Sequence, residues 1–214
     1  MATVQAPLTP ASNTAPAVVS VPSGVPSGAS WCAQYPGSAS VADCVAPFKA
    51  NLTAFLAALN AAGATVRLSA TLRPANRAYL MHWSYMIAHD GHDPRTVPAR
   101  DGVNIAWVHT DAQGAYDATA STTGAQAMVS GYSMGSLNTP PALESKHISG
   151  LAVDMTITWT GNLTINNQSG TAVVISTAPK TGMNADLATV GATFGVIKFV
   201  GGATDAPHWS DDGH

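Results

Sequence analysis

The sequence is poor in charged residues, and those it has are not clustered. Only 10% of its 214 residues are charged, with 9 Lys and Arg against 12 Asp and Glu, which gives a formal net charge of −3. Proteins that bind nucleic acid usually concentrate Lys and Arg on one face or along one helix. No such cluster exists here, so we expect no nucleic-acid partner.

Cysteines and long apolar runs are also scarce. No apolar stretch approaches the roughly 20 residues needed to cross a bilayer, so we expect no membrane span. The two cysteines, Cys32 and Cys44, are too few for a disulfide-rich scaffold and do not form a C-x-x-C pair. Their spacing permits one disulfide, which we expect to form if the protein works in the periplasm.

The first 30 residues contain no charged residue and are rich in Pro, Ser, Ala and Val. This composition predicts a flexible or polyproline-II tail over residues 1–30, or a segment that docks on a carrier such as a virion component or a secretion apparatus. No Sec signal is evident, since the basic and sustained apolar regions are lacking. Residues 31–214, in a chain with 46% hydrophobic residues, are expected to form a single domain around one core.

Apolar periodicity, prolines and glycines predict a mixed chain in which helices come first and most strands later. This order is typical of the α+β class, with an antiparallel sheet and flanking helices. The expected helices cover residues 47–62, 75–89 and 118–134 and a stretch after an Asn184 cap. The expected strands cover 64–72, 103–108, 151–159 and 195–200, with a hairpin across 166–170.

The most informative segment runs from Ser145 to Asp154 and has the pattern S-x-H-x-x-G-x-A-x-D. A second histidine, His208, follows in the segment Asp205-Ala206-Pro207-His208. His147, Asp154 and His208 make a set of three ligands with a fourth position open, which is typical of catalytic rather than structural zinc.

The strand predicted over residues 151–159 explains how these residues can meet. Its odd positions are apolar and its even positions small or polar, so Asp154 is expected on the polar face. Gly150 and Ala152 leave room beside it for a metal and a substrate. Pro207 favours an extended conformation at Ala206, which places Asp205 and His208 on a loop or strand end.

Together the two motifs resemble the M15 zinc metallopeptidases, which include D-alanyl-D-alanine peptidases and L-alanyl-D-glutamate endopeptidases of phage endolysins. The resemblance covers roughly residues 45–214 and implies the hedgehog-like zinc fold of that family. It also implies that His147, Asp154 and His208 hold Zn²⁺ and that Asp205 is the general base. Arg73, and Ser145 at the start of the motif, are then the expected substrate-binding residues, with Arg73 holding a carbonyl or carboxylate.

One difference from many family members concerns the base. The D-Ala-D-Ala enzymes commonly have glutamate at this place, whereas this chain has Asp205 and so resembles the L-alanyl-D-glutamate branch more closely. The shorter side chain withdraws the carboxylate by about one methylene, which affects where the attacking water sits.

The resemblance therefore implies a zinc-dependent hydrolase of peptidoglycan stem peptides, acting as a lysin or an injected effector. Such a protein would be made in the cytoplasm and act in the periplasm or cell wall after phage- or apparatus-mediated delivery. The alternative is a catalytically silent, zinc-stabilised part of a virion or secretion apparatus. Retention of Asp205 disfavours this alternative, because a structural metal site needs no base.

Three other patterns compete with this interpretation. Residues 131–135 match the G-x-S-x-G elbow of serine hydrolases, but prolines follow where a helix is needed. Residues 89–93 contain two histidines and two aspartates, in a place better explained as a solvated helix end. Glu144, the only glutamate, also stands three residues before a histidine, but it precedes the first ligand.

Overall fold

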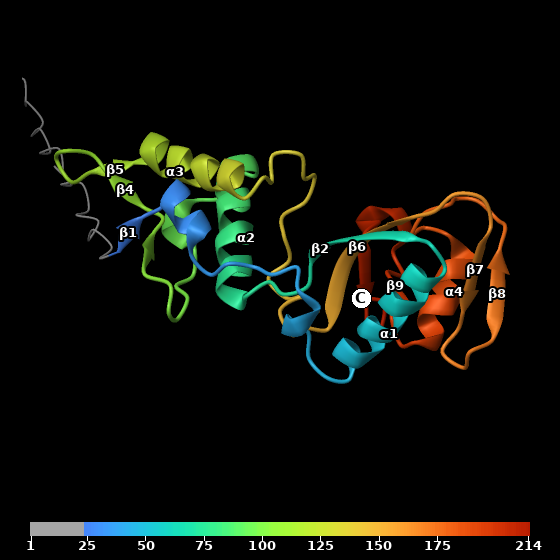
Figure 1. The fold of residues 1–214 in the computed structure, drawn as a ribbon. Helices are drawn as coiled ribbons and strands as arrows, with labels where there is room; N and C mark the ends of the chain where they lie inside the picture. The colour runs from blue at the N-terminus through green and yellow to red at the C-terminus, as the bar shows by residue number, and fades with distance from the viewer. Residues whose placement is uncertain (1–23) are drawn as a thin grey trace, which may run out of the picture.

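A computed structural model describes residues 24–214, which form an α+β structure with four α-helices and a four-stranded antiparallel sheet. Figure 1 shows two lobes joined by extended segments. The sheet lobe contains α1 (Phe48–Ala61), β2 (Thr65–Ala70), β6 (Ala152–Thr158), β7 (Leu163–Asn166), β8 (Ala172–Ile175), α4 (Ala185–Thr193), β9 (Ile197–Lys198) and β10 (His208–Ser210). The helical lobe contains β1 (Val25–Pro26), α2 (Ala75–His89), β3 (Ile105–Ala106), β4 (His109–Thr110), β5 (Tyr116–Asp117) and α3 (Ala118–Gly131).

The main sheet has the strand order β2-β6-β10-β9. Its centre is β6, which pairs antiparallel with both β2 and β10. Asp154 lies opposite Ala70 on one side and opposite His208 on the other. This register brings residues from three distant parts of the chain to one point on the sheet.

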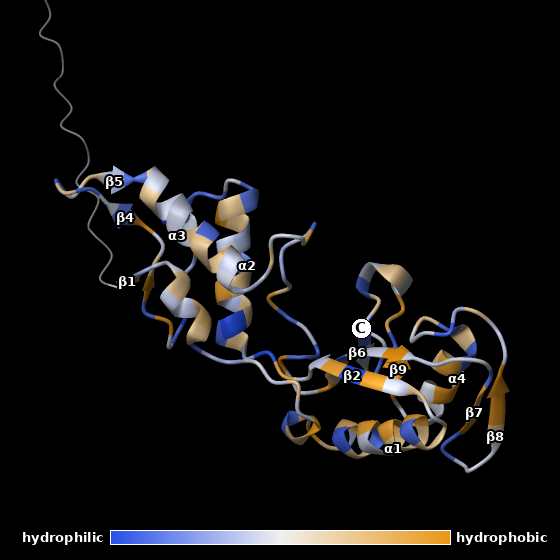
Figure 2. Ribbon diagram, turned by 45° about the horizontal axis from the view of Figure 1, so that its top comes forward, coloured by the Kyte–Doolittle hydropathy of each residue, from blue (hydrophilic) through white to orange (hydrophobic). Residues whose placement is uncertain are grey.

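The alternation expected for β6 is confirmed. Val153, Met155 and Ile157 are buried, whereas Asp154 on the other face is partly exposed. The apolar face packs against α1, whose residues Phe48, Leu52, Phe55 and Leu59 are fully buried in the same core. Figure 2 shows α1 lying along one face of the sheet, beside β2 and β6. Burying each such side chain stabilises the fold by about 2 kcal/mol, so α1 holds the sheet firmly at its apolar face.

Most of the predicted elements are present at nearly the predicted residues. Asn184 caps α4 through its Oδ1, which accepts from the backbone N–H groups of Asp186 and Leu187. The predicted hairpin is the β7–β8 pair, with Asn166 opposite Ala172. The predicted last strand is shorter than expected: β9 has two residues, and the chain then returns through β10.

The helical lobe has its own apolar core, although the sequence predicted one core for the chain. α2 and α3 pack on each other and on the short 3₁₀ helix Ala29–Ala33, with Trp31, Leu80 and Met128 among the buried residues. The apolar faces of the two helices are buried against each other, so this lobe forms its core without the sheet.

The tail predicted over residues 1–30 is only partly within the described residues, since 1–23 lie outside them. Residues 24–30 belong to the helical lobe. β1 pairs in parallel with β3, and the Trp31 indole N–H donates to the carbonyl of Pro26. The folded part of the chain therefore begins before the predicted boundary at residue 30.

The expected Cys32–Cys44 disulfide is wrong. Both cysteines are free: Cys44 is buried in the core of the sheet lobe, and Cys32 packs against the core of the helical lobe. Sequence spacing permitted the bond, but the chain between the two residues passes from one lobe to the other. Among residues 24–214, no helix combines the length and apolar character that a membrane span requires.

Candidate metal centre

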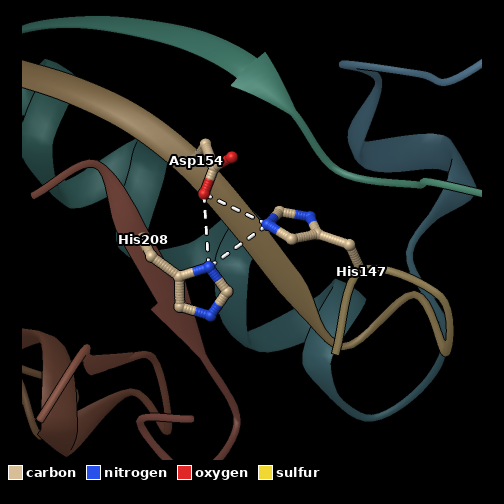
Figure 3. Close-up of side chains that lie close together, drawn as sticks. All are labelled: His147, Asp154 and His208. Atoms are coloured by element: carbon tan, nitrogen blue, oxygen red, sulfur yellow. Dashed lines mark hydrogen bonds and ion pairs between the residues drawn. The ribbon is translucent and has the colours of Figure 1, made fainter. Parts of the chain in front are cut away.

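Three side-chain atoms converge at the polar face of the main sheet, as Figure 3 shows. His147 Nε2 lies 3.1 Å from Asp154 Oδ1 and 3.2 Å from His208 Nδ1. The third side of the triangle, from His208 Nδ1 to Asp154 Oδ1, is 3.3 Å. The structure thus brings together the three residues that the sequence predicted as metal ligands.

Each of the three residues is placed by a different element. His147 lies in a tight turn that ends at Gly150, whose φ of 69° is easily adopted only by glycine. Asp154 lies on β6, and His208 is the first residue of β10, directly opposite it. His147 and His208 are 3% and 5% exposed, so water has little access to either ring from outside the site.

The outer nitrogen of each histidine faces a main-chain oxygen. His147 Nδ1 lies 3.3 Å from the carbonyl oxygen of Thr71, and His208 Nε2 lies 3.1 Å from that of His214. A carbonyl oxygen only accepts, so these outer nitrogens carry the protons and donate. The inner nitrogens therefore present lone pairs, and such outer partners are the usual means of orienting histidine ligands.

Two nitrogen lone pairs and a carboxylate oxygen thus point at one another. This arrangement is repulsive unless a cation or a proton lies between the three atoms. In a tetrahedral zinc site with ligands at about 2.0–2.1 Å, neighbouring ligand atoms are about 3.3–3.4 Å apart. The observed separations of 3.1–3.3 Å fit that geometry, and within residues 24–214 no fourth candidate ligand joins the three.

The protonation equilibria show the same attraction for positive charge. Burial alone would raise the pKa of the Asp154 carboxyl, but when a proton rather than a cation lies between the three atoms, His147 and His208 donate to the carboxylate and hold this pKa far below its usual value. Burial opposes protonation of His208, yet its partners Asp154 and His214 raise its pKa above the usual value. The site therefore keeps a carboxylate ionised and favours a cation beside it.

Asp205 lies next to the three ligands without joining them. It is the last residue of the 3₁₀ helix Gly202–Asp205, and its Oδ2 is 3.9 Å from His208 Nδ1. Burial, and then the negative charge of Asp154, raise the pKa of its carboxyl. The Asp205 carboxylate is half-exposed, has a raised pKa and lies close to the three candidate ligand atoms. This is the position expected for a proton acceptor.

Arg73 also reaches the site. Its backbone N–H donates to the carbonyl oxygen of His147, and α2 begins two residues later. Burial lowers the pKa of its guanidinium, whereas the charges of Asp154 and Asp205 raise it. The guanidinium of Arg73 thus lies within the electrostatic range of both carboxylates. Ser145 supports the turn instead, because its Oγ accepts the backbone N–H of His147.

Sequence reasoning missed two lysines that hold the site together. Lys198 on β9 donates to the carbonyl oxygens of Ala206 and His208, at 2.6 and 3.0 Å, and lies over the ring of Trp209. Lys146 forms ion pairs of 3.0 and 2.6 Å with Asp211 and Asp212. No sequence pattern marked either residue, because both contacts depend on strand pairing.

Lys146 supports the site indirectly, because it holds the segment that contains Asp211 and Asp212. Asp212 also accepts the backbone N–H of His214, whose carbonyl oxygen in turn accepts from His208. The chain of contacts from Lys146 therefore ends at the nitrogen that fixes the orientation of a ligand. Lys198 acts on the other side of the same histidine, at the turn that carries Asp205.

The competing motifs are not brought to the site. Ser133 follows α3 rather than a strand, so the serine elbow lacks its required setting. His89 ends α2 and is exposed, as expected for a solvated helix end. Glu144 is exposed and has no ion pair or side-chain hydrogen bond within residues 24–214.

Comparison with known proteins finds no counterpart: no family model, no curated protein and no solved structure matches this chain. The motif residues and the geometry of the site are therefore what indicates a function.

Proposed function

We propose that this protein is a zinc-dependent peptidase with the hedgehog-like fold of the M15 metallopeptidases. The observation that carries the proposal is the convergence of His147 Nε2, Asp154 Oδ1 and His208 Nδ1, with both imidazoles oriented by main-chain carbonyls. Three protein ligands and one open position are typical of hydrolytic rather than structural zinc.

His147, Asp154 and His208 would hold the zinc ion, which would supply a Lewis acid for the substrate carbonyl and would lower the pKa of water to about 7. Asp205, beside His208, accepts the proton from the attacking water and then delivers it to the leaving amine. The raised pKa of its carboxyl suits the first step, because a stronger base accepts the proton from water more readily. Arg73 holds the carbonyl oxygen or a substrate carboxylate and offsets the developing negative charge.

The proposed substrates are peptidoglycan stem peptides, cleaved at an L-Ala-D-Glu or a D-Ala-containing bond. Aspartate rather than glutamate at position 205 favours the first of these bonds. Such a substrate requires the protein to reach the periplasm or cell wall, and we propose delivery by a phage or a secretion apparatus.

The test is to incubate the purified protein with peptidoglycan, with and without a chelator, and to analyse the soluble products by mass spectrometry. We expect new amino termini that disappear with the chelator and return when Zn²⁺ is added. A protein that binds zinc tightly but releases no fragment would instead be the silent structural component.

A further inference from the structure

A large cleft lies between the two lobes and is not part of the metal site itself. Its volume is about 1080 Å³, at the upper end of the range of about 300–1,000 Å³ for small-molecule sites. One wall belongs to the helical lobe and includes Tyr79, Ala99 and Asp101. The other belongs to the turn that carries His147 and includes Glu144 and Ile148.

The cleft is directly continuous with the residues that build the metal site. Lys146 and Ile148, on either side of His147, line it, and so does His214, whose carbonyl oxygen orients His208. Ala75 also lines it, two residues after Arg73. Neighbouring Cα atoms are about 3.8 Å apart, so the cleft begins within about one residue of a ligand.

The walls of the cleft carry both charges, and two of the acidic groups described have no ion-pair partner. Lys146 is paired with Asp211 and Asp212, whereas Arg100 donates to the neutral Asn76 side chain and keeps its charge. Asp101 and Glu144, on opposite walls, are exposed and form no ion pair within residues 24–214. Apolar side chains such as Ile148 also line the cleft. A peptide with aliphatic side chains and a free amino group matches this lining in shape and charge.

We propose that this cleft binds the part of the peptide substrate that extends away from the scissile bond. The helical lobe then serves to recognise substrate, with Asp101 and Glu144 accepting an ammonium group of the bound peptide. This inference rests on the proposed function, because it takes the metal site as the place of cleavage.

The test uses the full chain, loaded with zinc and carrying Asp205→Asn to prevent turnover. Ala99 is exposed on the helical wall, so Ala99→Trp fills the cleft without touching a core. Ala112→Trp is the matched control, an exposed alanine of the same lobe that does not line the cleft. The probe is a synthetic stem tetrapeptide whose diamino acid has a free side-chain amine, and its Kd is measured by calorimetry.

We expect Ala99→Trp to weaken binding of the tetrapeptide at least 10-fold, and Ala112→Trp to leave the Kd unchanged. Glu144→Gln should weaken binding about 3- to 10-fold, and acetylation of the peptide's side-chain amine should have a similar effect. Zinc content and melting temperature, measured for every variant, exclude misfolding as the cause. Equal Kd values for the Ala99→Trp and Ala112→Trp proteins would overturn the proposal.

The two proposals fail in different ways. If wild-type protein cuts peptidoglycan but filling the cleft does not change tetrapeptide binding, the cleft assignment is wrong and the peptidase assignment stands. If wild-type protein binds the tetrapeptide in the cleft but never hydrolyses it, the cleft assignment stands without the catalytic one. Absence of any tetrapeptide binding would overturn the cleft proposal directly.

Discussion

The two lobes contribute differently to the site. All three candidate ligands, together with Asp205 and both positioning lysines, belong to the sheet lobe or to the turn that leads into it. The helical lobe supplies no ligand and instead forms one wall of the cleft. The candidate metal site thus lies in the lobe with paired strands and a large core. The neighbouring wall of the cleft lies in the lobe built mainly from helices.

The difference has a physical reason. Atoms separated by 3.1–3.3 Å must be held by elements that cannot slide, and the register of β6 with β10 does this for Asp154 and His208. A wall that contacts a flexible peptide needs less precision.

Removing a ligand should abolish the metal site. In the His147→Ala and His208→Ala proteins we expect loss of bound zinc and of all chelator-sensitive hydrolysis, measured by metal analysis and product release. His89→Ala, in the helical lobe, is the control and should retain one zinc per chain. Full zinc occupancy in either ligand variant would contradict the assignment.

Asp205→Asn should retain zinc but lower kcat by about 10²–10⁴-fold, the usual effect of losing a positioned base. The carboxylate lies 3.9 Å from His208 Nδ1 and outside the triangle of ligand atoms, so metal content should not change. Asp90→Asn makes the same chemical change at an exposed helix end of the helical lobe and should leave kcat as in the wild type. A normal kcat for Asp205→Asn would remove Asp205 from the mechanism.

Lys198→Met should weaken zinc binding or activity about 10- to 100-fold, as loss of an outer partner of a metal site typically does. The ammonium group holds the carbonyl oxygens of Ala206 and His208, which fix the turn between the base and the last ligand. Lys198→Arg should restore part of the loss. Lys180→Met is the control in the same lobe, and identical zinc affinity for the two methionine variants would rule out a positioning role.

Deleting residues 1–29 should destabilise the helical lobe while leaving the ligands in place. The deletion removes β1 and, among other contacts, three hydrogen bonds: those of the Val25 and Ser27 N–H groups to β3 and its flank, and that of the Trp31 indole to Pro26. At about 1 kcal/mol each, their loss should lower the free energy of unfolding by about 3 kcal/mol, measured by denaturant titration. Deletion of residues 1–23 is the control, and equal stability of the two shortened proteins would contradict the role of β1.

The sequence predicted the candidate ligands because His147 and Asp154 lie in one motif with local spacing, and His208 lies in a second short motif with Asp205. The alternation of residues 151–159 placed Asp154 on the polar face of β6, and the β7–β8 hairpin and the Asn184 cap also follow from local patterns. What it could not predict depends on contacts between distant segments. The pairing of β9 with β10 brings Lys198 to the turn at Ala206, and the separate packing of α2 on α3 creates a second core.

The smallest effect is expected for the cysteines, and it tests the separation of the lobes. Cys32 and Cys44 lie in different lobes, and burial raises the pKa of both thiols, which slows oxidation at neutral pH. Mass spectrometry of non-reduced protein after aerobic purification should therefore find two free thiols. The Cys32→Ser protein should also show the same zinc content as the wild type. A Cys32–Cys44 bond would require the two lobes to approach each other, and its detection would show that their arrangement changes in solution.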